Sequence, residues 1–152
     1  MSDTSNFDPF VFLNAESESG FDTEYTPVPA KEYIAAISKV TPRALEDGRV
    51  VMDVQWKFSD AEATEATGLP ENSVRQTVWL DTNEHGGLAK GKGKNVALGR
   101  LLSALGMNDG SAFSFNALVG KMGKIKVDHK LGKAGTEREG QVEAYVKAVA
   151  GL

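Results

Sequence analysis

The sequence contains no cysteine, and only two histidines and two tryptophans occur among its 152 residues. The absence of cysteine excludes a disulfide framework, a thiolate nucleophile and a cysteine-ligated zinc site. Two histidines leave few side chains that can exchange protons near neutral pH. No apolar run approaches the roughly 20 residues of a membrane helix, and the N-terminus lacks the basic and then apolar segments of a signal peptide. We therefore expect a cytoplasmic protein without a membrane span.

Motifs of common enzyme classes are also missing, and no Gly-x-Ser-x-Gly nucleophile elbow occurs. Residues 86–95 are rich in glycine and lysine, but they do not form a P-loop because Lys94 is followed by Asn95 rather than by serine or threonine. One polar cluster with metal-binding side chains consists of Asp81, Glu84 and His85. In a turn, such side chains more often bond the nearby backbone. We predict a binding domain that is not an enzyme and that uses neither a metal nor a cofactor.

The net charge of −4 conceals three zones of different charge. Residues 1–26 hold six acids and no lysine or arginine, which gives −6. Residues 27–84 hold ten acids and six bases, and residues 85–152 hold five acids and eleven bases, which gives −4 and +6. A mildly acidic protein whose C-terminal half is positive can present a basic surface to a polyanion.

The N-terminal segment combines acids with scattered phenylalanines and shows no sustained period of 2 or 3.6. Its acids and phenylalanines are Asp3, Asp8, Glu16, Glu18, Asp22, Glu24, Phe7, Phe10, Phe12 and Phe21. Such segments bury too little apolar surface to offset their ordering entropy. We predict a disordered tail over residues 1–26 and a folded domain over residues 27–152, because Pro27 and Pro29 favour extended backbone at the domain entry.

Alternating side chains predict a strand over residues 50–58, with its apolar residues on one face. Residues 32–40 read as its antiparallel partner, joined to it through a turn at residues 46–48. Residues 59–73 are polar and predict an exposed loop with at most one helical turn. Three further strands are expected over residues 74–80, 122–129 and 141–149.

A stripe of apolar side chains predicts one helix over residues 96–105, with Asn95 as its N-cap and Gly106 as its C-terminal stop. A second helical turn is expected over residues 116–119. The resulting order, β-β-β-α-β-β, is that of an OB-fold-like five-stranded antiparallel barrel, a fold that often binds oligonucleotides. The alternative is a β-sandwich with a helix packed over one end.

Three aromatic residues on the expected strands can either fill the core or stack on bases. Trp56 shares a face with Val54 and Phe58, so we assign it to the core. Trp79 lies on the face opposite its apolar neighbours, and Tyr145 alternates with apolar residues in the same way. We therefore expect Trp79 and Tyr145 to face a ligand.

Lysines gather in two places in the C-terminal half. The glycine-rich loop holds Lys90, Lys92 and Lys94, and the fourth strand carries Lys124, Lys126 and Lys130 on one face. Cationic side chains on a flexible loop and on a strand face can follow a phosphate backbone. The alternative for each group is a solvated linker or a solvated outer face.

The chain resembles a phage family of small proteins from replication and recombination modules, many known only as domains of unknown function and some regarded as single-stranded-DNA-binding. The resemblance rests on four segments in a shared order, Pro29 to Tyr33, Leu80 to Gly106, Leu118 to Lys121, and Gln141 to Tyr145. The acidic tail has no counterpart in it. The resemblance implies strand-coating DNA binding in the cytoplasm of an infected bacterial cell.

Together these observations predict sequence-tolerant binding of single-stranded DNA. The residues expected to contact it are Trp79, Lys90, Lys92, Lys94, Arg100, Lys121, Lys124, Lys126, Lys130 and Tyr145. We expect the tail to compete for the basic surface and to offer Phe7, Phe10 and Phe12 to a replication or recombination protein. A homo-oligomer is compatible with the sequence. The alternatives are a virion or assembly protein whose tail docks on a neighbouring subunit, and a small phage inhibitor of a host enzyme.

Overall fold

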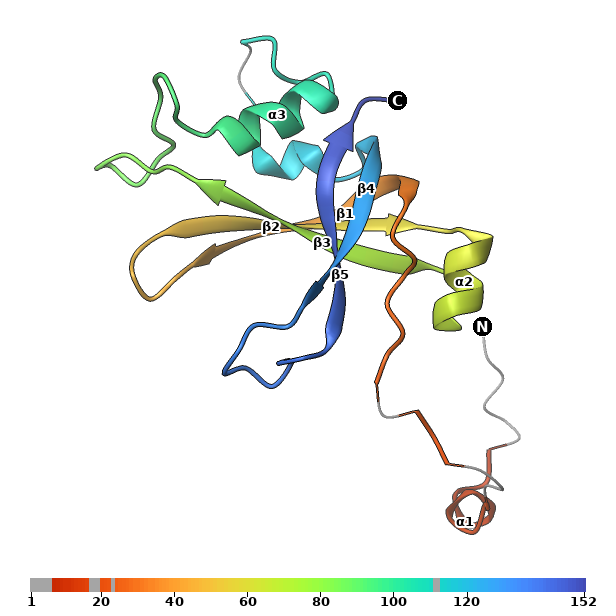
Figure 1. The fold of residues 1–152 in the computed structure, drawn as a ribbon. Coiled ribbons are helices and arrows are strands. Elements are labelled where there is room, and N and C mark those ends of the chain that lie inside the picture. The colour runs from red at the N-terminus through yellow and green to blue at the C-terminus, as the bar shows by residue number, and fades with distance from the viewer. Residues whose placement is uncertain (1–6, 17–19, 23, 111–112) are drawn as a thin grey trace.

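The computed structural model describes residues 7–16, 20–22, 24–110 and 113–152. Five strands form one antiparallel sheet in the order β3-β2-β1-β4-β5 (Figure 1). The strands are β1 Glu32–Ala44, β2 Val50–Phe58, β3 Asn72–Leu80, β4 Met122–Leu131 and β5 Val142–Ala150. The helices are α1 Pro9–Leu13, α2 Ala61–Thr67, α3 Val96–Ala104 and the 3-10 helix η1 Phe115–Leu118. The prediction of a mainly β fold with five antiparallel strands is confirmed.

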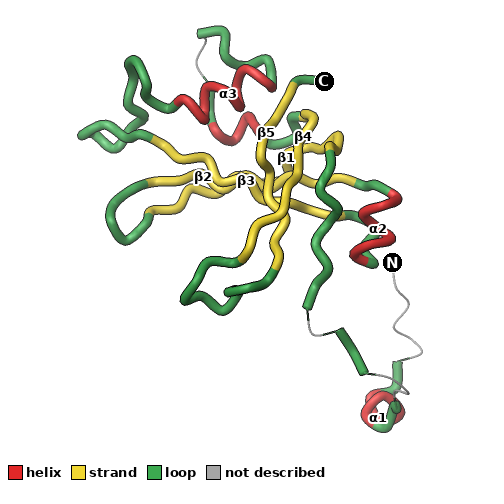
Figure 2. The backbone as a smooth tube through the Cα atoms, in the orientation of Figure 1, coloured by secondary structure: helices red, strands yellow, loops and turns green. Residues whose placement is uncertain are grey.

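Strand β1 belongs to both halves of the sheet. Its beginning, residues 32–36, pairs with β4, and residues 36–44 pair with β2. The β1–β2 register shifts between Ile37 and Lys39, and such an irregularity bends a strand and increases its twist. The sheet therefore coils, so that its outer strands β3 and β5 approach each other (Figure 2).

No backbone ladder joins β3 and β5 in the part of the chain that the structure describes. The structure is thus an open five-stranded sheet. Among the described residues, no hydrogen-bonded pairing of β3 with β5 closes it into the predicted barrel. Helix α3 packs against both outer strands and fills the space between them at one end (Figure 1).

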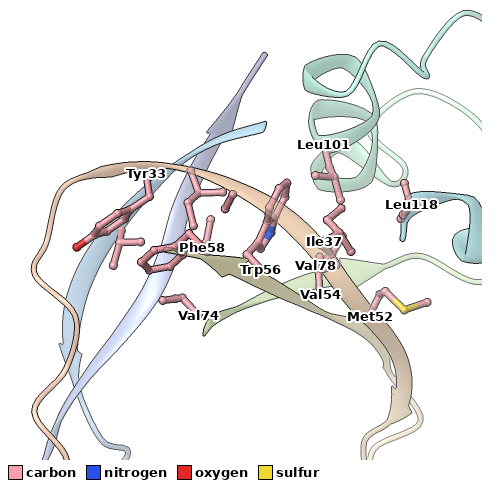
Figure 3. Packing of buried hydrophobic residues seen from close by; sticks show 14 of the residues in the cluster. Tyr33, Ile37, Met52, Val54, Trp56, Phe58, Val74, Val78, Leu101 and Leu118 are labelled. Carbon is pink, nitrogen blue, oxygen red and sulfur yellow. The ribbon is translucent and has the colours of Figure 1, made fainter. Parts of the chain in front are cut away.

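The core lies on the concave side of the sheet, where Trp56 is completely buried between β1 and α3 (Figure 3). Its indole Nε1 donates a hydrogen bond of 2.9 Å to Oε1 of Gln76, so the one polar group of the ring is satisfied. Tyr33 and Phe58 stack with ring centroids 4.2 Å apart. The assignment of Trp56 to the core is confirmed.

Helix α3 turns Leu98, Leu101 and Leu102 onto this core, as its apolar stripe predicts. The N-cap prediction for Asn95 is wrong in its mechanism, because the Asn95 side chain makes no capping hydrogen bond and its φ is 52°. Instead, its Nδ2 donates to the carbonyl oxygens of Asp81 and Ala89 at 3.0 and 2.9 Å. Asn95 therefore closes the base of the loop over residues 81–95, which carries Lys90, Lys92 and Lys94 and which we call the lysine loop.

The expected exposed loop between β2 and β3 contains helix α2, which is longer than the single turn we predicted. Asp60 caps it by accepting a hydrogen bond from the backbone N–H of Ala63 at 3.1 Å. Lys31 binds both Asp60 and Glu62, with distances of 3.0 and 2.9 Å. These ion pairs attach α2 to the start of β1.

The tail prediction missed helix α1. Asp8 accepts a hydrogen bond of 2.9 Å from the backbone N–H of Phe10, and Pro9 occupies the first helical turn, where its missing N–H costs nothing. The Asp-Pro pair was therefore a helix-start signal. The predicted tail also includes Asp3 and Glu18, which lie outside the described residues. No helix in the described part of the chain is long and apolar enough to cross a membrane.

Candidate nucleic-acid interface

An open groove of about 860 Å³ lies between the outer face of β1, β2 and β3 and the hairpin of β4 and β5. The hairpins β1–β2 and β4–β5 extend from the sheet as separate arms on its two halves (Figure 1). Leu69 and Glu71 from the α2–β3 connection line one end, together with Tyr25 and Thr26. The groove is thus built from segments that are far apart in the sequence.

Strand register arranges the floor of the groove in rows. One row runs from Thr41 through Asp53 to Thr77, and the next row runs from Lys39 through Gln55 to Arg75. Side chains directly opposite each other on antiparallel strands share one face, so these six polar residues form a continuous surface. The floor is polar and carries a cation at each end of the second row.

Trp79 stands at the edge of this floor and is 49% exposed. The guanidinium of Arg49, from the β1–β2 hairpin, lies over its ring at 4.8 Å from the centroid. The cross-strand partner of Trp79 is Val51, which is completely buried although it faces away from the main core. Trp79 is therefore held on the outer face, as predicted, with a cation on one side of its ring.

Tyr145 lines the opposite wall of the groove and is half-buried. The ammonium group of Lys130 lies 5.2 Å from its ring centroid. Trp79 and Tyr145 therefore each have a cation beside the ring. Such pairs combine a flat surface for a base with a charge for the adjacent phosphate.

The acids of the groove are neutralised by nearby bases. Arg43 Nε contacts Asp53 Oδ2 at 2.9 Å, and Arg138 Nε contacts Glu143 Oε1 at 2.7 Å. Glu71 pairs with a lysine of β2 at 3.4 Å. Within the described residues, the groove cations that form no ion pair are Lys39, Arg75 and Lys130.

Asp53 is the acid in the middle of the floor. Burial opposes its ionisation, but hydrogen bonding and charge from Arg43, the charge of Arg75 and the hydroxyl of Thr77 outweigh burial and lower the pKa of Asp53. Asp53 is therefore an anion at neutral pH, and its charge is compensated locally.

The predicted contact residues do not all lie together. Trp79, Lys130 and Tyr145 line the groove. A second hollow beside α3 is lined by Lys90, Lys94 and Arg100, and Lys92 lies on the exposed loop that borders it. This loop begins two residues after Trp79, and Figure 1 shows it extending beyond the end of β3.

The remaining lysines are in a different place. Lys124 and Lys126 lie on the outer face of β4, opposite Ile34 and Glu32 of β1, and they line neither the groove nor the second hollow. Lys121 lies in the turn just before β4. The lysine stripe of β4 is therefore divided, since only Lys130 reaches the groove.

Sequence reasoning missed four basic residues, Lys39, Arg49, Arg75 and Arg138, that line the groove or cover Trp79. Lys39 and Arg75 lie on the polar faces of their strands, and this alternation was a usable signal. Arg49 and Arg138 lie in hairpin loops, where no alternation of residues indicates which way a side chain points.

A scan against protein-family models gives no match, and a comparison with curated proteins also gives no match. The geometry of the groove is therefore the basis on which a function is proposed.

Proposed function

We propose that the protein binds single-stranded DNA without strong sequence preference, in the groove between β3 and β5. One observation carries this proposal. Two aromatic residues from distant strands, Trp79 and Tyr145, line one groove together with the unpaired cations Lys39, Arg75 and Lys130. Stacking platforms beside a cationic track are the features by which proteins hold single strands.

The groove favours single strands over duplex for a physical reason. Bases stack on an aromatic ring only when their own faces are free, and in a duplex those faces are covered by neighbouring base pairs. Phosphates of the same strand would then contact Lys39 and Arg75 on the floor and Lys130 on the wall. Binding of this kind is insensitive to base identity because every base has a flat face.

We further propose that the fold is a partly open OB-like barrel. The strand order and the shared strand β1 support this proposal. In OB-folds, oligonucleotides contact strands 2 and 3 and the loops that join strands 1 to 2 and 4 to 5. The corresponding loops here hold Arg49 and Arg138.

A longer strand would leave the groove at Trp79 and meet the lysine loop. The loop starts at Asp81 and is closed by hydrogen bonds between Asp81 and Asn95. In this arrangement Lys90, Lys92 and Lys94 extend the contact beyond the groove, and they add phosphate contacts rather than stacking.

The proposal is tested with fluorescently labelled single-stranded and double-stranded oligonucleotides of the same length, titrated with full-length protein at low salt. We expect clear preference for the single strand, together with quenching of the emission of exposed Trp79. Equal affinity for single-stranded and double-stranded oligonucleotides would mean that the groove is a general cationic surface and does not select single strands. If neither oligonucleotide binds, the proposal is wrong. The alternatives are then a virion or assembly protein and an inhibitor of a host enzyme.

A further inference from the structure

The outer face of β1, β4 and β5 carries a second exposed surface, which we call the outer strip. It consists of Glu32, Ile34, Ala36, Met122, Lys124, Lys126, Ala148 and Ala150. Strand register aligns these side chains in rows, since Ile34 is opposite Lys124 and Lys124 is opposite Ala150. The strip is therefore one continuous patch across three strands.

Aliphatic side chains surround Lys124 in the middle of the strip, with Ile34 on β1, Ala150 on β5 and Met122 on the same face of β4. Ile34 and Met122 are 59% and 52% exposed, although each is a large aliphatic side chain on a strand that contributes to the core. The small side chains of Ala148 and Ala150, opposite Lys126 and Lys124 on β5, let another backbone or ring approach closely. No aromatic residue belongs to the strip, so it lacks the stacking platforms of the groove.

The two lysines of the strip lie on β4, its middle strand. Lys124 has only a long contact of 3.9 Å to Glu32, and Lys126 forms no ion pair among the described residues. An apolar patch beside free ammonium groups is complementary to a segment that carries exposed apolar side chains between acids.

Helix α1 is such a segment. None of its residues is buried, and Phe10, Phe12 and Leu13 are 78%, 66% and 78% exposed. The acids Asp8 and Glu16 flank it. Its ends are already ordered by Asp8 and by Asn14, whose Nδ2 donates to the carbonyl of Phe10 at 2.9 Å. A capped helix loses less conformational entropy on binding than a disordered peptide does.

The helix lies apart from the strip of its own chain. Figure 1 shows α1 separated from the sheet, on the side where α2 covers the end of β2. Leu13 and Val28 are 15 residues apart in the sequence. A chain of that length spans up to about 50 Å when extended, which is enough to reach a second molecule.

We infer that α1 of one copy docks on the outer strip of a second copy. The apolar side chains of α1 cover Ile34 and Met122, and Asp8 and Glu16 approach Lys124 and Lys126. The two contacting surfaces differ, so the contact is heterologous and the copies join head to tail, as an open chain or a ring. The inference concerns association without DNA and does not depend on the proposed function.

The test measures the mass of full-length protein in solution, without DNA, by sedimentation velocity over a range of concentrations. A five-residue helix buries far less than the roughly 1,200 Å² of a stable interface, so we expect a dissociation constant on the order of 100 µM. The weight-average mass should rise above the 16.3 kDa of one chain as the concentration passes that value. A mass that stays monomeric to millimolar concentration overturns the inference.

Two variants locate the contact. The tail variant Phe10→Ala/Phe12→Ala and the strip variant Lys124→Glu/Lys126→Glu should each weaken association at least tenfold. The control Lys90→Glu/Lys92→Glu makes the same charge change elsewhere and should leave association unchanged. If the strip variant is poorly folded by circular dichroism, Ile34→Thr replaces it. Association that survives both the tail and the strip variants overturns the inference.

Mixing the two variants separates the head-to-tail contact from the other arrangements. The tail variant keeps an intact strip and the strip variant keeps an intact α1, so the mixture should form a one-to-one dimer that does not grow further. A symmetric contact of strip with strip instead predicts that the tail variant dimerises by itself, because its strip is intact. A contact of α1 within its own chain predicts no dimer in the mixture. Either result would overturn the inference.

Discussion

The groove and the outer strip both carry exposed lysines, but different side chains surround those lysines. In the groove, Lys130 lies over the ring of Tyr145, and Lys39 borders a polar floor. On the outer strip, Lys124 and Lys126 border aliphatic side chains and alanines. The comparison teaches that similar lysines can stand in different chemical surroundings. Under our two proposals, the residues beside the charge determine whether it suits a phosphate chain or an acidic peptide.

Trp56 on β2 points into the core, whereas Trp79 on β3 points to the outer face and the groove. Trp56→Ala should lower the free energy of unfolding by about 3–5 kcal/mol, because it removes a completely buried ring from the core. Urea unfolding followed by circular dichroism measures this loss. Trp79→Ala should change stability by far less, and a larger loss for Trp79 than for Trp56 would mean that the two faces are exchanged.

Stacking should distinguish the two surfaces in binding. Trp79→Ala is expected to weaken single-strand binding by about 1–3 kcal/mol, because one base loses its platform. The matched control is Met122→Ala, which removes a similarly exposed side chain from the outer strip and should leave affinity unchanged. Equal effects of both substitutions in the same titration would contradict the division into two surfaces.

The salt dependence of binding should identify which cations contact phosphate. Each lost phosphate contact lowers the slope of log affinity against log salt by roughly 0.7 on single strands. We expect a smaller slope for the triple alanine variant of Lys39, Arg75 and Lys130, and also for that of Lys90, Lys92 and Lys94. The triple variant of Lys121, Lys124 and Lys126 should keep the wild-type slope. An unchanged slope for the loop variant would show that the loop is only a linker.

The acidic tail should compete with DNA. Tyr25 and Thr26 line the end of the groove, so the tail leaves the domain beside the proposed binding surface. A tether of this length keeps the local concentration of its charges near the millimolar scale. Deleting residues 1–26 should tighten single-strand binding at low salt and have less effect at high salt, where charges are screened. Unchanged affinity at low salt would exclude this role.

The smallest expected effect concerns Asp53 in the floor of the groove. The pKa of Asp53 is lower in the folded protein, so its carboxylate contributes stability above about pH 4 that is lost as the pH falls further. Asp53→Asn should therefore cost under about 1 kcal/mol at pH 7, and the difference from wild type should shrink at pH 3. Urea unfolding at both pH values measures it. An equal difference at both would contradict the ion pair with Arg43.

Local pattern was enough to predict most of the elements. The alternation of residues 50–58 predicted both β2 and the burial of Trp56, because period-2 side chains on one face must share one environment. The apolar stripe of α3 was equally direct. Helix α1 was missed, although Asp8 and Pro9 form a recognised helix start, because a five-residue helix contains too few residues to show a period.

Part of the candidate site was predicted. Trp79 and Tyr145 were expected to face outward because each alternates along its strand with apolar residues, a pattern that can be read from neighbouring residues alone. Whether two such residues share a groove depends on which strands become neighbours. That depends on β1, which pairs with both β2 and β4 and bends between Ile37 and Lys39.

The sequence by itself determined which side chains leave the core, because alternation and helical periodicity are local properties. Only the tertiary structure decided where those side chains meet. It separated Lys130 from Lys124 and Lys126, although all three alternate on one strand, and it placed Lys39 and Arg75 in one row across three strands. The physical reason is that sheet coiling and strand register act between distant segments, and no local pattern of residues records them.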